Sequence, residues 1–284
     1  RNLAWLWVLL AVAVLGGVPF GVKSYMLRKY FAEEHRQMAA ENERKAREEA
    51  ARFKDKTFTV NGVTFEMVAV KGGTFTMGAS SGDSYADSDE KPAHSVTLSD
   101  YYIGKFEVTQ ELLEAVMGSN PSYFKGSKLP VECVSWDDCQ TFIRKLNSLT
   151  GANFRLPTEA EWEFAARGGS KSKGYKYSGS NSINDVAWYD GNSGSKTHAV
   201  GTKSPNELGI YDMSGNVWEW CQDWYGSYSS GSQTNPQGPS SGSYRVLRGG
   251  SWIFNAGDCR VSNRYYNTPV NGYNDDGFRL VLVP

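Results

Sequence analysis

Cysteine and histidine are the side chains best suited to redox, nucleophilic and metal chemistry, and this chain contains few of them. They are Cys133, Cys139, Cys221 and Cys259, with His35, His94 and His198. The cysteine spacings match no zinc motif, and four thiols allow three disulfide pairings between which the sequence does not choose. The histidines lie far apart, and no Ser/His/Asp or two-His-one-carboxylate set is present in motif form. Hydrolytic and zinc chemistry therefore have no visible basis in the sequence.

A different kind of chemistry is concentrated near the C-terminus, between Ile253 and Asp276. This stretch is rich in Asn, Tyr, Asp, Gly and Val in no periodic order, and the sequences RGGSW and GFRL flank it. Tyr offers a large contact area and Asn offers adaptable hydrogen bonds at modest entropic cost, as in antibody binding sites. Asn, Asp and Gly are also common in turns, so an ordinary loop is the alternative. We interpret the stretch as a binding surface.

The composition indicates what kind of domain must position these residues. The chain has 284 residues, of which 40% are hydrophobic and 13% aromatic, enough for one sizeable core. The formal net charge of -1 offers no basic surface, so we expect no nucleic-acid partner. Thirty Gly, nine Trp and sixteen Tyr are typical of an irregular, loop-rich α+β domain rather than a helical bundle.

Regular elements are predicted mainly in the first half of this domain. Apolar and polar residues alternate from residue 57 around Asn61-Gly62, which predicts a β-hairpin. Beyond Gly168, Gly, Ser, Asn and Asp dominate and predict long irregular connections. Helices are predicted at 107–117, closed by Gly118, at 137–149, opened by a capping box at Ser135, and at 159–167, opened by one at Thr158.

The beginning of the chain is apolar. Residues 3–22 contain no charge and are long enough for a helix across a hydrocarbon core of about 30 Å. A cleaved signal peptide is the alternative, but the apolar run is longer than a signal peptide requires and no cleavage pattern follows it. We therefore predict a transmembrane helix within residues 1–23 as the membrane contact of the protein.

A charged segment follows the apolar one. Residues 24–56 are rich in Lys, Arg, Glu and Ala and lack Pro and Gly, which predicts a solvated helical stalk. Pairs of opposite charge such as Glu41–Lys45 and Glu43–Arg47 support the helix. The apolar residues keep no sustained heptad, so a coiled coil is not the first interpretation. An oligomer or complex partner could still contact the span and stalk.

The charged residues on either side of the predicted span do not determine which side of the membrane the domain occupies. Basic residues after the span outnumber those before it, which favours a cytosolic C-terminal side. A large domain can be translocated regardless of such charges, and a binding function favours a periplasmic or extracellular domain. We expect a single-pass membrane protein with its C-terminal domain outside the cytoplasm.

Seven motifs make a family resemblance specific. They are "GGTFTMG", "EVTQ", "PVECVSWDDC", "FRLPTEAEWEFAARGG", "PNELGIYDMSGNVWEWCQDWY", "RVLRGGSW" and "GFRLV". Their order and spacing resemble those of the formylglycine-generating enzyme (sulfatase-modifying factor) family over about residues 57–284. The resemblance implies a C-type-lectin-like α+β domain with much irregular structure, preceded here by the transmembrane helix and the stalk.

The resemblance also implies what chemistry to look for. Members of the family oxidise a substrate cysteine with copper held by two cysteine thiolates, which are soft ligands suited to Cu(I). Phe254 stands where the first of these cysteines would fall, and Cys259 is the only thiol nearby. One sulfur cannot build a two-thiolate site, so we expect no copper and no catalytic residues. An oxidoreductase of the formylglycine-generating type is the enzymatic alternative.

A calcium site is a further implication of the resemblance. The family binds calcium in the segment that corresponds to residues 211–220. The matching donors are the side chain of Asp212, the backbone carbonyls of Gly215 and Val217, and the carboxylate of Glu219. Hard oxygen donors of this kind suit calcium, which we expect in a structural role. The alternative is that Asp212 and Glu219 cap turns and pair with arginine.

The C-terminal stretch is also similar to the variable protein of a diversity-generating retroelement, in which adenines of a template repeat are randomised. Asn codons changed in this way cannot encode Lys, Glu, Gln, Met or Trp, and none of these five occurs between Ile253 and Asp276. The resemblance implies that these residues lie exposed on one face of the domain. The candidate ligand-binding residues are Ile253, Phe254, Asn255, Asp258, Asn263, Tyr265, Tyr266, Asn267, Asn271, Tyr273, Asn274 and Asp275.

These observations favour a membrane-anchored, receptor- or adhesin-like protein that displays a diversified C-terminal surface on a non-catalytic scaffold. Its expected ligand is a protein rather than a small molecule, because exposed tyrosines amid polar loops are typical of protein-binding sites. A structural subunit of an envelope complex, held through the span and stalk, is the other non-enzymatic alternative.

Overall fold

The computed structural model describes residues 19–79 and 82–284, and the chain divides into two compact units, Arg1–Lys54 and Asp55–Pro284. Most of the predicted membrane span, residues 3–22, lies outside the described residues. Within the described ranges, no helix combines the length and the apolar character needed to cross a bilayer. The transmembrane segment therefore stays a prediction, and each unit is described by itself.

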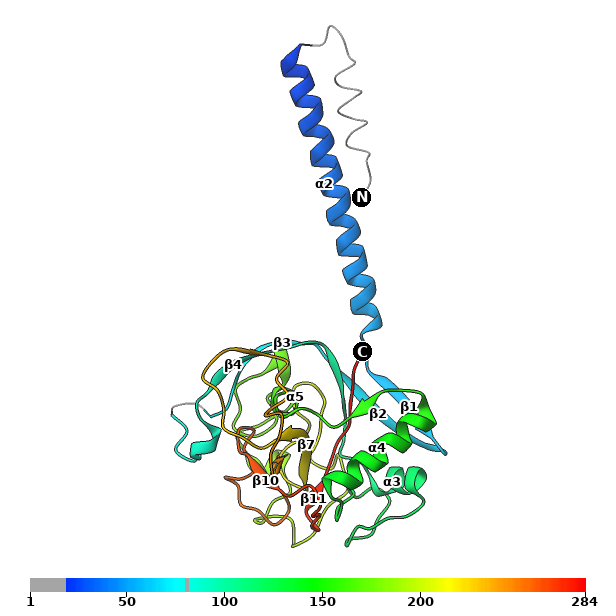
Figure 1. Cartoon of the computed structure of the whole chain (residues 1–284), viewed down its shortest axis with the longest axis vertical. Helices are drawn as coiled ribbons and strands as arrows, with labels where there is room; N and C mark the ends of the chain where they lie inside the picture. The colour runs from blue at the N-terminus through cyan, green and yellow to red at the C-terminus, as the bar shows by residue number, and fades with distance from the viewer. Residues whose placement is uncertain (1–18, 80–81) are drawn as a thin grey trace. The chain divides into compact units, whose positions relative to one another are not determined.

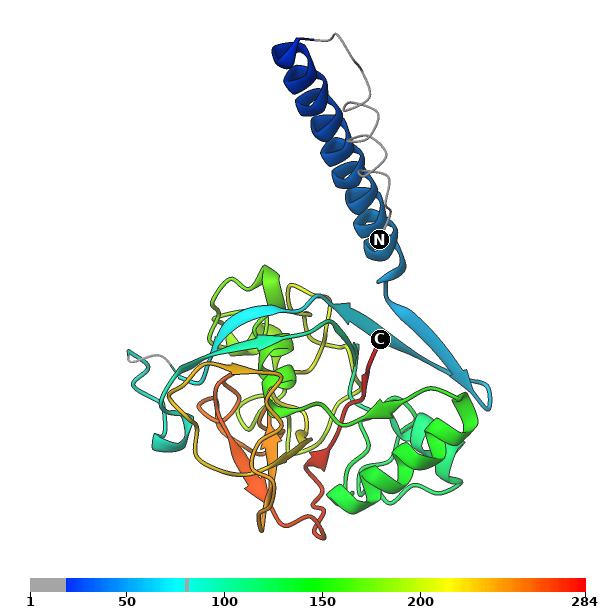
Figure 2. The ribbon, with the colours of Figure 1, turned by 45° about the horizontal axis from the view of Figure 1, so that its top comes forward.

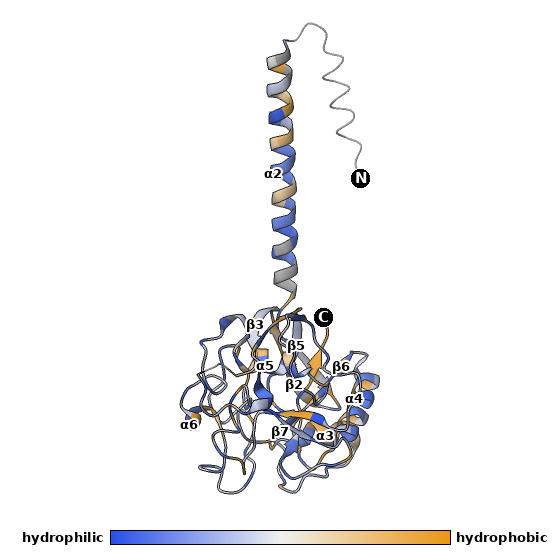
Figure 3. Cartoon of the chain, turned by 60° about the vertical axis from the view of Figure 1, so that its left-hand side comes forward, coloured by the Kyte–Doolittle hydropathy of each residue, from blue (hydrophilic) through white to orange (hydrophobic). Residues whose placement is uncertain are grey.

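The first unit contains one long helix, α2 (Phe20–Arg52), where the sequence predicts the stalk. The helix starts at Phe20, directly after Pro19, so it includes the last residues of the predicted span as well as the stalk. It ends before residue 56 because Lys56 already belongs to the first strand of the domain. The predicted pairs Glu41–Lys45 and Glu43–Arg47 form at 2.8 and 2.7 Å, and both are exposed. Figure 3 shows polar residues along most of α2.

The second unit is a mixed α/β domain with short elements and long loops (Figures 1 and 2). Its strands are β1 (Lys56–Val60), β2 (Val63–Val70), β3 (Gly73–Met77), β4 (His94–Leu98), β5 (Tyr101–Gly104), β6 (Phe154–Arg155), β7 (Trp218–Trp224), β8 (Gln233–Thr234), β9 (Arg245–Arg248), β10 (Tyr265–Asn267), β11 (Asp276–Gly277) and β12 (Val281–Leu282). Its helices are α3 (Gln110–Met117), α4 (Trp136–Thr150), α5 (Glu159–Ala166) and α6 (Ile183–Val186), with 3-10 turns η1 (Ser88–Glu90) and η2 (Gly169–Lys171).

Three sheets organise the domain. They have the strand orders β1-β2-β5-β12-β6, β10-β9-β7-β11 and β3-β4-β8. The predicted hairpin is confirmed, because β1 and β2 pair antiparallel with Val60 opposite Val63. Asn61 and Gly62 form its turn with φ of 49° and 85°, a left-handed conformation that these two residue types tolerate.

Two of the three predicted helices, α4 and α5, begin within one residue of the predicted start, because side chains cap them. Ser135 accepts a hydrogen bond from the backbone N–H of Asp138 and opens α4, and Thr158 does the same for Glu161 and opens α5. The helix α3 begins at Gln110 rather than at residue 107, because Thr109 is its N-cap. It ends at Gly118 in the left-handed conformation, as predicted.

The long loops after α5 are anchored by four buried arginines from the C-terminal region. Each pairs with a buried carboxylate that is distant in sequence: Arg248 with Glu163, Arg260 with Glu90 (2.5 Å), Arg264 with Glu159 (2.6 Å) and Arg279 with Glu219 (2.5 Å). Removing one partner of such a pair would leave an uncompensated buried charge, at a cost of about 3–5 kcal/mol. The pairs therefore fix the loops that have little regular structure.

Candidate functional site: an exposed aromatic surface

The C-terminal segment lies across the four-stranded sheet. It leaves β9, forms β10 at the edge of this sheet, and returns as β11 at the opposite edge. β10 pairs antiparallel with β9, with Tyr266 opposite Val246, and β11 pairs parallel with β7. In Figure 1 this segment is the orange and red chain that joins β10 and β11 at the lower side of the domain.

Five large apolar side chains of the segment are exposed to solvent. They are Ile253 (54%), Tyr265 (44%), Tyr266 (42%), Val270 (70%) and Tyr273 (54%). A group of exposed large apolar side chains in one segment is a candidate interaction site. We define these five residues as the display surface.

The aromatic rings of the display surface rest on other rings of the sheet. Tyr265 stacks on the buried Trp218 with ring centroids 5.2 Å apart. Phe254 contacts both Trp218 and Tyr265, at 5.2 and 5.7 Å. Tyr266 lies 4.3 Å from Tyr225. These contacts restrain the exposed tyrosines, so binding a partner costs them little side-chain entropy.

The remaining candidate ligand-binding residues differ in exposure. Asn255 and Asn271 are exposed, whereas Phe254, Asp258, Asn267 and Asn274 are half-buried. Asn263 and Asp275 are buried, at 4% and 8% exposure, and the structure does not offer them to a partner. The Asn263 carbonyl accepts a hydrogen bond from Arg248, and the Asp275 carboxyl accepts one of 3.0 Å from the Ser251 hydroxyl. These two residues hold the segment in place.

Two adjacent carboxyls lie beneath the display surface. Burial raises the pKa of Asp276 to about 8, and the neighbouring charge of Asp275 adds to this shift. Burial also raises the pKa of Asp275. The Asp276 carboxyl accepts hydrogen bonds of 3.3 Å from the Tyr273 N–H and from the Asn267 side chain. The loop that carries Tyr273 is thus hydrogen-bonded to a carboxyl that is uncharged near neutral pH.

The residues that the resemblance compares with the family's copper-binding stretch, Phe254 and Cys259, are packed into the domain. Phe254 packs its ring between Trp218 and Tyr265 instead of providing a thiolate. Cys259 is fully buried, and burial raises the pKa of its thiol far above the usual range. The other three cysteines are free thiols, of which only Cys133 is not buried.

The four expected calcium donors lie near a group of buried charges. The Asp212 carboxyl accepts a 2.6 Å hydrogen bond from the Gly201 N–H, and burial raises its pKa to about 6. Glu219 pairs with Arg279 and accepts a 2.8 Å bond from the Trp162 indole. Gly215 has a φ of 79°, and a Cβ there would lie 2.2 Å from the Trp188 carbonyl oxygen, so only glycine fits.

A third acid belongs to this group and was missed by the sequence reasoning. Burial raises the pKa of Glu107, and repulsion from Asp212 and Glu219 adds to the shift. Its carboxyl accepts a 2.7 Å bond from the Asn216 side chain. Three buried carboxyls therefore face one guanidinium, that of Arg279. Among the described residues, no group of three or more His, Cys, Asp or Glu is arranged to hold a metal ion.

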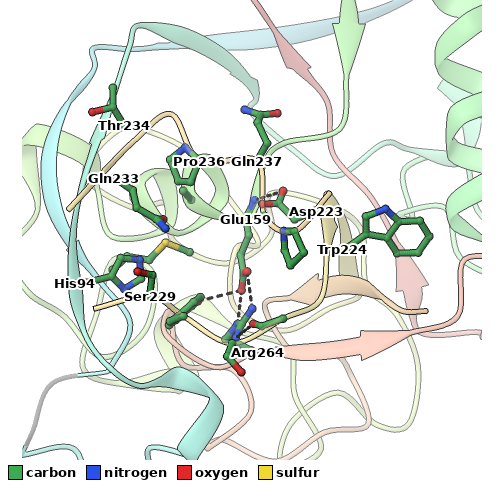
Figure 4. A pocket seen from close by; sticks show the side chains of 17 residues that line it. His94, Glu159, Asp223, Trp224, Ser229, Gln233, Thr234, Pro236, Gln237 and Arg264 are labelled. Carbon is green, nitrogen blue, oxygen red and sulfur yellow. Dashed lines mark hydrogen bonds and ion pairs between the residues drawn. The ribbon is translucent and has the colours of Figure 1, made fainter. Parts of the chain in front are cut away.

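A cavity of about 480 Å³ opens beside α5 (Figure 4). Glu159 on its wall accepts hydrogen bonds from Arg264 at 2.6 and 2.8 Å. The neighbouring Asp223 accepts a 2.9 Å bond from the Glu159 N–H, and burial raises its pKa to about 8, with repulsion from Glu159 adding to the shift. His94 lines the same cavity, and its Nδ1 lies 3.0 Å from the Pro92 carbonyl oxygen. These polar side chains on the cavity wall therefore already have hydrogen-bond partners within the protein.

Fold and site together define a class of protein: a loop-rich mixed α/β domain, tied by buried arginine–carboxylate pairs, whose C-terminal segment forms an exposed aromatic surface. The chain belongs to the family of the sulfatase-modifying factor enzyme 1-like domain, which matches residues 54–283. The family that the seven motifs resemble is thereby confirmed.

Three known proteins of different kinds are similar to the chain. The chain is 38% identical to Treponema denticola variable protein 1, with a TM-score of 0.74 over 81% of this chain and 99% of that one. It is 30% identical to the formylglycine-generating enzyme of Thermomonospora curvata, over 77% of this chain and 93% of the enzyme. It is 39% identical to the chaperone protein LppX of Paenibacillus barcinonensis, over 70% of this chain and 83% of the relative. The similarity to a variable protein agrees with the resemblance of the C-terminal segment.

Proposed function

We propose that this protein binds a ligand through a diversified C-terminal surface displayed on a non-catalytic, C-type-lectin-like scaffold. The observation that carries the proposal is the display surface itself, five large apolar side chains exposed in one segment. The chain on either side of this surface is held by buried pairs such as Arg248–Glu163 and Arg279–Glu219. Side chains can therefore change at the surface without loss of the fold beneath it.

The proposed ligand is a protein. The tyrosines offer large, restrained contact areas, which suit protein recognition. Four cavities of the domain, with volumes of about 200 to 480 Å³, open elsewhere, and none of these four is lined by a residue of the display surface. Small molecules bind in concave sites, whereas an exposed sheet edge fits an extended protein surface.

Replacement of the exposed tyrosines tests this function. Twelve-residue peptides selected from a random library on the full chain in detergent serve as the probe. We expect Tyr265→Ala, Tyr266→Ala and Tyr273→Ala, combined, to abolish peptide binding and to leave the thermal melt within a few degrees. The control is Leu149→Ala, which removes a 50% exposed apolar side chain from the end of α4. Peptides that bind the triple variant as tightly as the unchanged chain would exclude the proposed surface.

The encoding DNA tests whether the segment is diversified. A diversified gene should be accompanied by a near-copy of its last hundred or so bases that differs only at adenines, beside a reverse transcriptase gene. Codons of the exposed residues should correspond to adenine-containing codons of the copy. A genome without such a copy would leave a binding surface that is fixed rather than diversified.

We propose calcium as a structural ion held by Asp212, Gly215, Val217 and Glu219. The support is the excess of buried carboxyls, since Glu107, Asp212 and Glu219 share one guanidinium, that of Arg279. A divalent cation would favour the charged forms of these carboxyls, whose pKa values burial raises at Glu107 and Asp212, and would stiffen the loop below the sheet. We expect added calcium to raise the melting temperature of the chelator-treated protein, and Asp212→Ala to remove most of this shift. An equal shift in the variant would place the ion elsewhere.

An oxidase of the formylglycine-generating type is the alternative function, favoured by the 30% identity to a formylglycine-generating enzyme. Anaerobic Cu(I) titration and turnover of a cysteine-containing peptide distinguish the two. Stoichiometric copper binding with aldehyde formation would replace the binding function as the principal one. A subunit of an envelope complex is the third function, and its partners would be lost when residues 1–54 are deleted but kept when the display surface is mutated.

A further inference from the structure

Two exposed tyrosines outside the C-terminal segment continue the display surface. The first is Tyr244, which precedes β9 and is 42% exposed. Its ring lies 5.0 Å from that of Tyr266, and its carbonyl accepts a 2.8 Å hydrogen bond from the Tyr225 N–H. Tyr244 therefore extends the row of rings that begins at Trp218 and continues through Tyr265 and Tyr266.

The second is Tyr123, in the loop between α3 and α4, which is 70% exposed. Its ring packs edge-on against Phe124 at 5.0 Å, and Phe124 packs edge-on against Trp252 at 5.4 Å. The indole of Trp252 donates a 3.0 Å hydrogen bond to the Asn274 carbonyl. Tyr123 is thereby connected, through two rings, to the loop that carries Tyr273.

The loop of Tyr123 is held firmly against the segment. The Glu132 carboxylate accepts a 2.8 Å hydrogen bond from the Phe124 N–H, and the Ser122 hydroxyl accepts one of 3.1 Å from the Glu132 N–H. The adjacent Cys133 N–H donates a 2.8 Å bond to the Tyr273 carbonyl. These backbone bonds fix the position of Tyr123 relative to Tyr273 whichever side chains the segment carries.

Carboxylates surround this enlarged surface. Asp137 and Asp190 are exposed, and their N–H groups donate bonds of 3.2 and 3.0 Å to the carbonyls of Pro269 and Phe254. Asp258 is half-buried within the segment, and burial raises its pKa as it does those of the buried Asp275 and Asp276, so these three contribute less negative charge. Within the described ranges, no ion pair involves Asp137 or Asp190. Arg245 is half-buried between Trp136 and Trp224, whereas Lys125 and Lys196 are exposed on loops.

We propose that the partner contacts Tyr123 and Tyr244 together with the display surface, and that its contacting segment carries Lys or Arg side chains. This inference rests on the proposed binding function and specifies the partner of the same site. Cations bind favourably over tyrosine rings and near uncompensated carboxylates, and apolar stems of Lys and Arg pack on the rings. Tyr123 and Tyr244 lie outside the stretch that would vary, so they supply contacts common to every version of the segment.

The test uses peptides selected from a random twelve-residue library on the full chain. We expect the selected peptides to be enriched in Lys and Arg over Asp and Glu. We expect Tyr123→Ala and Tyr244→Ala each to weaken their binding about fivefold or more, as contact residues at protein interfaces do. Asp137→Asn combined with Asp190→Asn should weaken the binding of Lys-containing peptides and reduce its dependence on salt.

The outcomes separate this inference from the function on which it rests. Peptides that depend on Tyr265 and Tyr266 but are insensitive to Tyr123→Ala and Tyr244→Ala would overturn the inference and keep the function. Peptides insensitive to all four changes would overturn both. A selected pool with no excess of Lys and Arg would overturn the charge part of the inference. Thermal melts of each variant, and Leu149→Ala as the control, show that a loss of binding is not a loss of folding.

Discussion

At the scale of single residues, the domain separates two kinds of buried carboxyl. Those paired with arginine stay charged: burial opposes the charge of Glu159, but Arg264 and Arg248 outweigh it and hold its pKa below the usual range. Those without a paired cation have raised pKa values, as at Asp212, Asp223 and Asp276. The first kind stabilises the fold at neutral pH, and the second kind must take up a proton to do so.

Asp223 gives a test of this difference. Its pKa is about 8 in the folded protein and about 4 in an unfolded chain, so folding takes up a proton between these pH values. Stability from this group is complete below pH 4 and is lost as pH rises to 8. Asp223→Asn mimics the protonated form and keeps the acceptor for the Glu159 N–H. We expect the free energy of unfolding of the variant, relative to that of the unchanged chain, to rise by about 1.4 kcal/mol for each pH unit between pH 5 and 8.

Denaturant unfolding at pH 5, 6, 7 and 8 measures this gain. The control is Asp190→Asn, because Asp190 is exposed and forms no ion pair within the described ranges. If the free energies of unfolding of Asp223→Asn and the unchanged chain differ by the same amount at every pH, Asp223 is already ionised in the folded protein.

The sequence identified most of the exposed residues of the site but not the supporting ones. Tyr265, Tyr266 and Tyr273 were predicted as contacts from residue type and place in the segment, and they are exposed. Asn263 and Asp275 were predicted as contacts in the same way, yet both are buried: the Asn263 backbone carbonyl accepts a hydrogen bond from Arg248 in β9, and the Asp275 carboxyl accepts one from the Ser251 hydroxyl. No local pattern distinguishes a polar side chain that faces solvent from one that bonds to a distant residue.

At the scale of elements, the loop between β10 and β11 depends on one close backbone approach. A Cβ at Gly272 would lie 2.5 Å from the carbonyl carbon of Val134 and 2.7 Å from the nitrogen of Ser135. Main-chain atoms cannot rotate away as a side chain can, so the loop must move to admit any larger residue. This glycine therefore fixes the height of the loop above the N-terminus of α4.

Gly272→Ala tests the dependence of the site on this contact. We expect a loss of stability of about 1–3 kcal/mol from overpacking, and weaker binding of the library-selected peptides because Tyr273 is displaced. The matched control is Gly231→Ala, where a Cβ would meet only the Ser229 hydroxyl, at 3.7 Å. Unchanged stability and peptide binding in Gly272→Ala would show that the loop adapts without cost.

Helices and strands that the neighbouring sequence specifies, for example through a capping residue, were predicted, whereas those that depend on distant residues were not. The capping boxes at Ser135 and Thr158 gave the starts of α4 and α5, because a cap requires only neighbouring residues. β12 has two residues and pairs with β5 and β6, which lie more than a hundred residues earlier in the chain. A strand of this length has no periodicity, so its position follows from tertiary pairing rather than from sequence pattern.

At the scale of the whole molecule, the chain is divided near Lys54 into a helical unit and a compact domain. The domain contains the buried arginine pairs, the three sheets and the display surface, and none of these requires a residue before Asp55. We therefore expect residues 55–284 alone to melt within a few degrees of the full chain and to bind the same library-selected peptides. A domain that unfolds or loses its ligand on removal of residues 1–54 would contradict the division.

We propose that the apolar residues 3–22 hold the protein at a membrane. We expect the full chain to stay with the membrane pellet after alkaline carbonate washing, and residues 55–284 to stay in the supernatant. Leu10→Arg places a charge at the centre of the apolar run and should lower the retained fraction, because a charge there costs about 2.5–3.5 kcal/mol. If carbonate removes the full chain from the membrane as readily as residues 55–284, the apolar residues are not a membrane anchor. A protease added to spheroplasts would then distinguish a display surface outside the cytoplasmic membrane from one facing the cytosol, since only the former is accessible to cleavage.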